Sequence, residues 1–334
     1  MASLEGAAPS DSSSQTVSVA YQPPSPQIRN SSEESFLSIS LDALYMKRLS
    51  GRQKYLVVHD TIGDLFLASK VMTSRQLLSQ FDWELGGRAA LMAGPSDKHS
   101  GELLFIWVEE WSGAKTARDP FDLAYPFGSH QYTHDYFAAS LVRGTYSSKM
   151  REGEFNYWHH MTPRNVDYFS FSTIVGLKGF YLGEHIQLTY HKPPDVSTYF
   201  AMTKNRLLGI QLGLNLQVNP YQWMSWEITV KGGAYGNDAW AKNWLGDQNN
   251  TVLVRAFHGS KLVPSYLVSG DLMIRFRLFP HCMLEIGGGL LGGWNLATAP
   301  IQLSRGIQKG SGRRVVATDK VYYQNLLAGL YFDF

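Results

Sequence analysis

The 334-residue sequence has little net charge, few charged residues and a single cysteine. Lys and Arg number 30 and Asp and Glu number 28, so the net charge of +2 creates no strong field for a polyanion, and no nucleic-acid partner is expected. Charged residues make up 17% of the chain, below the roughly 25% of an average soluble domain. Cys282 has no second cysteine to pair with. A disulfide scaffold and a cysteine-based zinc domain are therefore excluded.

Long apolar runs are also missing. No stretch of about 18 apolar residues occurs, and the mean hydropathy is −0.19, which excludes a transmembrane helix. The first residues, MASLEGAAPSDSSSQ, lack the charged start and apolar core of a secretory signal, so a signal peptide is missing from this sequence. A transmembrane β-barrel is still compatible with the composition, because its apolar residues are distributed in alternation.

The composition divides the chain into a short tail and one large domain. Residues 1–35 are rich in Ser, Pro and Gln and have almost no large apolar side chains, so they cannot bury enough surface to offset the entropy of ordering. We predict a disordered N-terminal tail there. From residue 36 to residue 334 the composition stays uniform and no repeat of fixed period is visible, which indicates a single domain.

The main structural signal is a period of two. In residues 208–218 one face carries Leu208, Ile210, Leu212, Leu214, Leu216 and Val218, whereas the other face is small and polar. Such alternation is typical of a strand with one apolar and one polar side. The segments 81–92, 226–235, 268–278 and 284–294 follow the same pattern. A soluble β-sandwich alternates too, so this pattern alone does not separate the two folds.

The lengths of the connections favour the barrel. Short links are predicted at Leu182–Glu184, Asn219–Gln222 and Pro280–His281, and long ones at 192–203, 237–264 and 297–320. Outer-membrane barrels have short periplasmic turns and long outer loops. An additional strand at Tyr132–Val142, with a turn near Arg143 and Gly144, makes the strand number even. We predict an all-β fold, a closed antiparallel transmembrane β-barrel of about 12 strands, with a range of about 10 to 14.

The C-terminus carries a third indication. The last strand ends in apolar residues at alternate positions, and the final residue is Phe. This pattern is similar to the signal that bacterial outer-membrane proteins present to the barrel-assembly machinery, which we expect as a partner. The residues of this predicted signal are Leu326, Ala328, Leu330, Phe332 and Phe334.

Six segments together resemble a known family. They are LDALYMKR (41–48), FDWELGGRAAL (81–91), WVEEWSGAK (107–115), SSKMREGEFNYWHH (147–160), NRLLGIQLGLNL (205–216) and GGGLLGGWNLATAPIQ (287–302). They resemble the planctomycete-type outer-membrane β-barrel porin family, which also occurs in environmental chlamydia-like bacteria. The resemblance covers most of residues 36–334 and departs from the family in an insertion around 116–140. It implies an outer-membrane barrel with a transport function and no catalytic residues.

The charged and polar residues on the inward faces are the candidate functional residues. By strand phase they are predicted to line a pore, in which fixed charges select solutes. They are Asp82, Glu84, Arg88, Gln211, Asn215, Gln217, Glu227, Lys231, Asp271, Arg275, Arg277 and Glu285. The two signs are nearly balanced, so we expect weak selectivity. The alternative is a paired network that only makes the wall rigid.

Metal and catalytic sites have little support in the sequence. His130 and His134 are spaced for one helical face, but they lie in an aromatic, loop-like segment, and His159 and His160 point to opposite faces of a strand. The sequence contains no GxSxG motif and no defined nucleophile with its base. We therefore expect no metal, no cofactor and no enzymatic activity.

Three functions are compatible with these observations. The first is a channel in the bacterial outer membrane that passes small polar solutes or ions with weak charge selectivity. The second is a surface-exposed recognition or adhesion barrel with a plugged lumen, acting through its long loops. The third is a soluble extracytoplasmic β-protein that binds a hydrophobic ligand. For the two membrane forms, the outer-membrane lipid is the expected surrounding.

Overall fold

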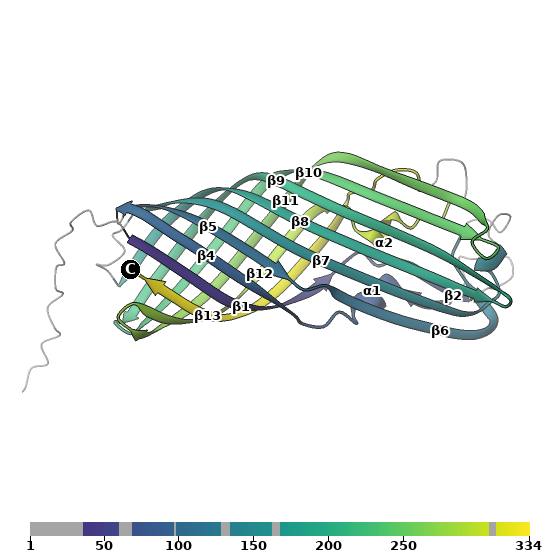
Figure 1. Ribbon diagram of the computed structural model, residues 1–334, viewed down its shortest axis with the longest axis horizontal. Helices are drawn as coiled ribbons and strands as arrows, with labels where there is room; N and C mark the ends of the chain where they lie inside the picture. The colour runs from purple at the N-terminus through teal and green to yellow at the C-terminus, as the bar shows by residue number, and fades with distance from the viewer. Residues whose placement is uncertain (1–35, 60–68, 97, 128–133, 162–167, 307–311) are drawn as a thin grey trace, which may run out of the picture. The chain divides into compact units, whose positions relative to one another are not determined.

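The computed structural model describes residues 36–59, 69–96, 98–127, 134–161, 168–306 and 312–334. The chain divides into two compact units, Met1–Ser32 and Glu33–Phe334. The predicted tail, residues 1–35, lies outside the described residues. The second unit contains one thirteen-stranded antiparallel sheet (Figure 1).

Ten strands of this sheet close into a ring in which every neighbour is antiparallel. Around the ring the order is β7, β5, β4, β1, β13, β12, β11, β10, β9 and β8, and β8 returns to β7. Their bounds are β1 Phe36–Ser50, β4 Glu84–Ser96, β5 His99–Val108, β7 Ala139–His160, β8 Phe169–Lys192, β9 Asp195–Tyr221, β10 Met224–Asp247, β11 Val252–Phe279, β12 Cys282–Leu296 and β13 Asp319–Asp333. The predicted closed all-β barrel is confirmed, with an even strand number at the low end of the expected range.

The remaining strands form a branch on β7. Residues Arg151–His159 of β7 pair with β5, whereas its first residues pair with β6 (Trp111–Ala124). Strand β2 (Tyr55–His59) pairs with β6, and β3 (Lys70–Thr73) pairs with β2. The branch of β6, β2 and β3 therefore adds a further sheet beside the first residues of β7.

Three short helical elements complete the described structure. Helix α1 (Ser74–Leu78) begins with a capping box between Thr73 and Gln76, η1 (His134–Tyr136) is a single 3₁₀ turn, and α2 (Ala299–Gln302) lies in the β12–β13 connection. None of the described helices has the length and apolar character needed to cross a membrane.

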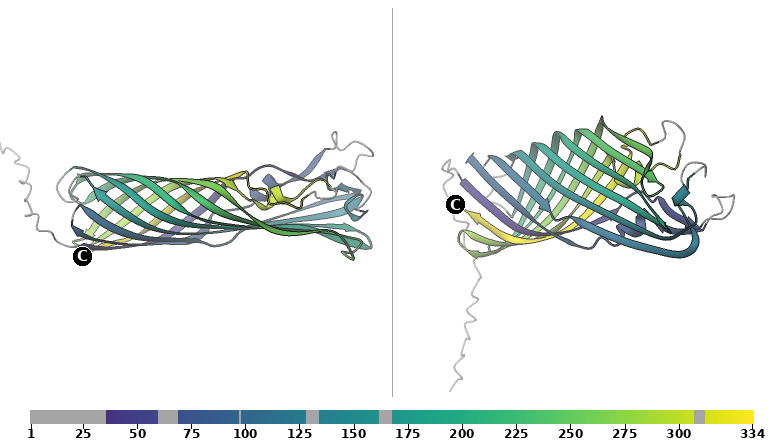
Figure 2. Two further views of the ribbon diagram at one scale, coloured as in Figure 1. Left: turned by 90° about the horizontal axis from the view of Figure 1, so that it is seen from above. Right: turned by 45° about the vertical axis from the view of Figure 1, so that its right-hand side comes forward.

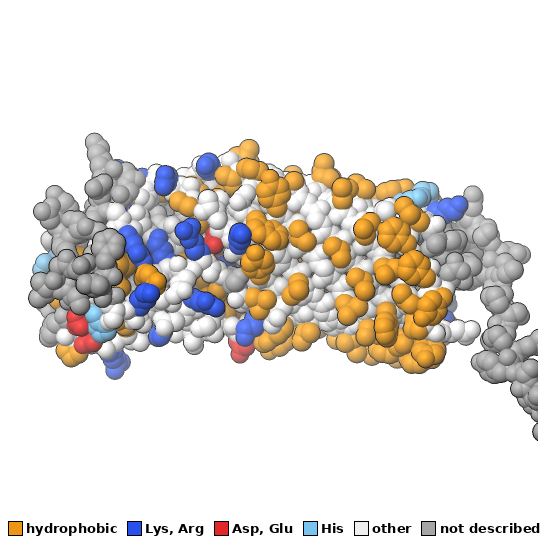
Figure 3. Space-filling view, turned by 180° about the vertical axis from the view of Figure 1, so that it is seen from behind, with side chains coloured by type: hydrophobic (Ala, Val, Ile, Leu, Met, Phe, Trp, Pro, Cys, Tyr) orange, Lys and Arg blue, Asp and Glu red, His pale blue; other side chains and the backbone are white. Residues whose placement is uncertain are grey.

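An apolar belt surrounds one half of the ring. Each ring strand contributes an outward side chain that is at least 46% exposed: Leu41, Leu85, Phe105, Phe155, Leu177, Leu212, Ile228, Leu272, Ile286 and Leu326. Figure 3 shows this belt toward one end of the barrel, with Lys and Arg side chains gathered beyond it. A belt of this size would be unfavourable in water and fits the acyl region of a bilayer.

The predicted alternation is correct along β9. Leu208, Ile210, Leu212 and Leu214 are exposed outward, whereas Gln211 and Asn215 are buried inside the ring. One residue of the apolar set in 81–92 differs, because Phe81 precedes β4 and is buried in the core rather than facing outward. The alternation of side chains between two faces holds only within a β-strand, and residue 81 comes before the first residue of β4.

The two ends of the ring differ. The end with the β9–β10 and β11–β12 turns, near residues 222 and 280, also holds Phe36 and Phe334 (Figure 1). The Leu37 and Phe334 backbones exchange two hydrogen bonds there. We name it the turn end, and the opposite one the far end. Strands β8, β9, β10 and β11 have 24, 27, 24 and 28 residues and continue toward the far end beyond the belt (Figure 2).

These long strands correct several predicted connections. The link at Leu182–Glu184 is wrong because β8 continues through it to Lys192, and the loops 192–203 and 237–264 are mostly paired strand. The strand at Tyr132–Val142 is also wrong: Arg143 and Gly144 lie inside β7, and residues 132 and 133 are outside the described residues. Beyond the belt the outer face is polar, so the alternation disappears although the backbone pairing continues.

Candidate functional site

The membrane half of the ring encloses a polar cavity. It measures about 1200 Å³ including the open solvent at its mouth, and charged residues from five strands line it. Among the predicted pore-lining residues, Arg88, Asn215, Gln217, Glu227, Lys231, Asp271 and Arg275 face this cavity. The strand phase therefore brings seven of the predicted residues to one space.

The other five predicted residues lie elsewhere. Gln211 and Glu285 are buried in the wall, where Gln211 donates to Asn156 and Glu285 accepts from Arg275. Glu84 is half-buried at the first residue of β4. Asp82 comes before β4, and its side chain is 84% exposed, while Arg277 is exposed near the turn end. Asp82 and Arg277 lie at strand ends, where a side chain can be exposed to solvent whichever face of the strand it is on.

One ion network in the wall was missed by the sequence reasoning. Glu154 on β7 accepts from Lys178 of β8 at 3.0 Å and from Lys231 of β10 at 2.5 Å, and Lys178 also contacts Glu152 at 2.6 Å. Asn156 donates to both Glu154 and Glu102. The alternation of Glu152, Glu154 and Asn156 in residues 147–160 was the available signal, because it places all three on one face.

Glycines make room for this network. A Cβ atom at Gly176 of β8 would collide with the Asn156 side chain, which faces it across the strand pair. Asn156 reaches Gln211 and Glu102 only because this space is empty. The glycine-rich wall therefore allows large polar side chains to fill a narrow ring.

A second ion network lies on the opposite wall. Arg275 of β11 contacts Glu227 of β10 and donates to Glu285 of β12, which also accepts from Ser40 at 2.7 Å. Arg88 lies 3.6 Å from Asp42 of β1. The inward charges are thus largely paired across neighbouring strands, and these pairs stiffen the wall as well as lining the cavity.

A buried layer of polar and aromatic side chains crosses the lumen beyond this cavity. Arg48 of β1 reaches across the ring to Glu184 of β8, and both side chains have no exposed surface. Glu184 also accepts from the Tyr146 hydroxyl at 2.9 Å and from the Ala299 backbone at 2.8 Å. Trp111 lies in the same layer, stacks near Tyr323 and donates to the Met46 carbonyl. These contacts join β1, β6, β7, β8 and the β12–β13 connection across the inside of the ring.

Residues 297–306, which we name the plug segment, fill the space beyond the layer. Asn205 of β9 exchanges two hydrogen bonds with the Ala297 backbone, each 2.8 Å long. Asn243 of β10 donates to the Gln302 carbonyl at 2.9 Å, and the Ser304 backbone donates to the Tyr199 hydroxyl at 2.7 Å. Helix α2 contacts β8, β9 and β10 (Figure 2). The plug segment is therefore anchored on several walls.

An aromatic cluster packs beside the plug segment. Tyr125, Phe127, Tyr136, Tyr190 and Tyr199 have no exposed surface and contact one another through their rings. Burial raises the pKa of the Tyr199 hydroxyl to about 12. The cluster contributes an apolar core outside the belt, so the far end of the ring is solid.

The surroundings shift the pKa of two ionisable groups in this far half. Burial lowers the pKa of the Lys54 ammonium, and the nearby cations Arg305, Arg52 and Arg255 act in the same direction, so that together they bring it to about 7. Burial alone would raise the pKa of Asp135. Hydrogen bonds from Ser197, His134 and the Asn249 backbone outweigh burial and lower it.

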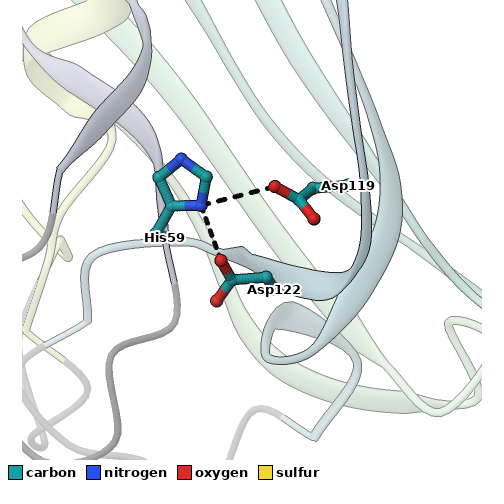
Figure 4. A group of neighbouring side chains, drawn as sticks. All are labelled: His59, Asp119 and Asp122. Atoms are coloured by element: carbon teal, nitrogen blue, oxygen red, sulfur yellow. Dashed lines mark hydrogen bonds and ion pairs between the residues drawn. The ribbon is translucent and has the colours of Figure 1, made fainter.

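A group of metal-ligating side chains lies at the rim of the far end. His59 ends β2, and its Nδ1 lies 2.7 Å from Asp122 Oδ2 and 3.6 Å from Asp119 Oδ2 (Figure 4). The three ligand atoms lie within 4.8 Å of one another, and the side chains are 32–42% exposed. Sequence reasoning missed this group because His59 is 60 or more residues from the two aspartates.

The histidines that the sequence analysis considered are placed differently. His130 lies outside the described residues, so the pairing with His134 stays a prediction. His134 instead contacts the neighbouring Asp135. His159 and His160 do face opposite sides: His159 stacks with His99, whereas buried His160 bonds Ser100 and Ser172. The prediction that His159 and His160 do not chelate together agrees with this geometry.

Comparisons with known proteins agree on the architecture. No family model matches the sequence, and no curated protein matches it. Among solved structures, the outer membrane protease OmpT from Escherichia coli is similar at a TM-score of 0.51 and 12% identity, over 93% of this chain and 100% of that one. The chain has the fold of an outer-membrane β-barrel. At this identity the likeness concerns the fold alone.

More distant matches include a toluene transporter and a FadL homologue. The toluene transporter TodX of Pseudomonas putida matches at a TM-score of 0.26 and 8% identity, over 91% of this chain and 90% of that one. A Pseudomonas aeruginosa FadL homologue matches at a TM-score of 0.24 and 6% identity, over 90% of each chain.

Outer-membrane β-barrels have their short turns on the periplasmic side of the bacterial outer membrane. The turn end of this barrel therefore faces the periplasm, and the far end is the outer end.

Proposed function

We propose that this chain is an outer-membrane barrel with a closed lumen that acts by binding at its outer surface. The observation that carries the proposal is the anchored plug segment above the Arg48–Glu184 pair. Hydrogen bonds hold it to β8, β9 and β10, so opening a path would expose several buried polar groups at once.

The length of the strands beyond the belt supports the same function. Strands β8 to β11 and the branch formed by β6, β2 and β3 build a solid outer half around the aromatic cluster. A channel needs no such structure outside the bilayer, whereas a binding surface needs a rigid support. The sequence contains no nucleophile motif, and we assign the chain a binding role rather than an enzymatic one.

The outer-membrane lipid and the barrel-assembly machinery complete the proposal as partners. The belt formed by Leu212 and its counterparts would contact acyl chains. The alternating residues from Leu326 to Phe334 would present the assembly signal, and both Leu326 on β13 and Phe334 directly after β13 are exposed. This exposed apolar belt disfavours the soluble alternative of a hydrophobic-ligand carrier.

A channel for small polar solutes is the second candidate, and the charged cavity favours it. The inward acids are Asp42, Glu102, Glu152, Glu154, Glu227, Asp271 and Glu285, and the inward bases are Arg88, Lys178, Lys231 and Arg275. This excess of acids would prefer cations if the plug segment moved aside. The resemblance to the planctomycete-type porin family belongs to this candidate as well.

Single-channel conductance separates the two candidates. The full chain would be refolded in detergent, inserted into planar bilayers, and checked for folding by heat-modifiable gel migration. We expect no discrete conductance steps from the wild type. A double variant, Asn205→Ala and Asn243→Ala, loosens the plug segment and should produce intermittent steps. Regular steps from the wild type would instead establish the channel.

A further inference from the structure

The rim group of His59, Asp119 and Asp122 combines one imidazole and two carboxylates from two strands. His59 comes from the end of β2, and both aspartates come from β6. Between Arg118 and Leu123, β6 advances five residues while its partner β7 advances only from Leu141 to Ala139. This bulge places Asp119 and Asp122 beside the same imidazole (Figure 4), although residues three apart on a regular strand face opposite sides.

The charges of this group are not balanced by a basic side chain. Within the described part of the chain, His59 is the only basic residue that forms an ion pair with Asp119 or Asp122. With a neutral imidazole the group carries two negative charges, which a divalent cation would neutralise. One imidazole nitrogen with two carboxylate oxygens is a donor set that suits Zn²⁺ better than Ca²⁺ or Mg²⁺.

The distances fit such an ion after small movements. Bonds of about 2.0 to 2.1 Å in a tetrahedral site separate the ligand atoms by about 3.3 Å. The imidazole Nδ1 now lies 2.7 Å from Asp122 and 3.6 Å from Asp119, so one distance must open and the other must close slightly. The partly exposed side chains can make this adjustment, and water can supply the fourth ligand.

We propose that His59, Asp119 and Asp122 bind one Zn²⁺ ion that clamps β2 to β6 at the outer rim. The seam between these strands is short, because only Val58 and His59 of β2 are in register with β6. A bound ion links the last residue of β2 to the bulge and adds a strong connection there. The clamp would hold the branch sheet closed over the outer core.

A second group of possible ligands provides the control. His134, Asp135 and Asp195 also lie close enough to share an ion. Asp135, however, is fully buried and already accepts hydrogen bonds from Ser197 and the Asn249 backbone. Binding there would require these bonds to break, so His134→Gln should leave zinc affinity unchanged.

The test titrates Zn²⁺ into the refolded full chain by calorimetry after removal of metals with a chelator. We expect one ion per chain, with binding weakened at least about tenfold by His59→Gln, Asp119→Asn or Asp122→Asn, because even outer-shell changes cost about 10 to 100-fold. Heat-modifiable migration checks that each variant is folded. Substituting Co²⁺ should give a visible absorption band that His59→Gln abolishes.

Hydrogen exchange of β2 gives an independent readout. Zinc should slow exchange of the Val57 and Val58 amides in the wild type and have no such effect in Asp122→Asn. Absence of zinc binding by the wild type would overturn the proposal, and the group would then be only a polar contact between β2 and β6. Binding that survives all three substitutions, or that His134→Gln removes, would overturn it as well.

Discussion

The Arg48 guanidinium and the Glu184 carboxylate form an ion pair across the lumen, with neither side chain exposed to solvent. The pair joins β1 to β8, which are not neighbours in the ring. Arg48 also donates to Ser148, and Glu184 accepts from the plug segment at Ala299. This one contact therefore connects two walls and the plug, and it marks the level at which the cavity ends.

Removing one partner of this pair should strongly destabilise the barrel. Arg48→Met leaves the Glu184 charge buried without its main cation, which typically costs about 3 to 5 kcal/mol. The exposed Arg151→Met on β7 is the matched control and should change stability by about 0.5 kcal/mol or less. Urea unfolding in detergent, followed by gel migration, measures both. Equal stability of the two variants would contradict the role assigned to the pair.

The inside and outside faces of β9 should respond oppositely to a charge. Leu212 is 63% exposed on the belt, so Leu212→Arg should cost about 2 to 4 kcal/mol near the bilayer midplane. Gln217 lines the cavity, and Gln217→Arg should fold nearly as well as the wild type because its side chain can remain in water. Refolding yield into lipid vesicles compares the two. Similar losses in both variants would contradict the assigned faces.

Lys54 should make the outer half more stable as the pH rises. Its pKa is lowered to about 7 by burial and by the neighbouring Arg305, Arg52 and Arg255, from the ordinary value of 10.5. Between these two values the unfolded chain binds the additional proton, so stability increases by up to about 1.4 kcal/mol per pH unit.

The neutral variant Lys54→Met lacks this dependence. Relative to the wild type it should be most stabilising below pH 7, and the advantage should shrink steadily toward pH 10.5. Thermal melting of both proteins from pH 6 to pH 10 provides the measurement. A difference that stays constant over this range would show that Lys54 is not responsible.

The hydrogen bond from the Ser197 hydroxyl to the Asp135 carboxylate should increase the stability of the hairpins at the outer end of the barrel. The Ser197 hydroxyl donates to Asp135 Oδ2 at 2.5 Å, and this bond contributes to the lowered pKa of Asp135. A depressed folded pKa gives stability that is present above pH 3.8 and is lost as the pH falls through the folded value.

The substitution Ser197→Ala should therefore cost about 1 to 3 kcal/mol at pH 7 and much less near pH 2. Thr198→Ala is the neighbouring control, because the contact of Thr198 with Asn250 uses its backbone. Thermal melting at the two pH values compares the variants. If Ser197→Ala were equally costly at both values, the hydroxyl would act through packing and not through the carboxylate.

By itself the sequence determined the β-barrel class, the belt and the inward position of seven residues that line the cavity. Leu208 to Leu214 and Arg88, Lys231 and Arg275 were placed on the correct faces, because side chains of a strand alternate strictly and a bilayer requires one face to be apolar. Where both faces are polar, as in residues 237–264, this signal vanishes and paired strand was interpreted as loop.

Only the tertiary structure decided that Arg48 and Glu184 pair across the lumen and where the rim group forms. Arg48 and Glu184 are 136 residues apart, and His59 and Asp122 are 63 apart. No local pattern connects such positions. Ring closure brings β1 opposite β8, and the bulge in β6 turns two aspartates toward β2; both depend on strand register across the sheet, which periodicity within one strand does not specify.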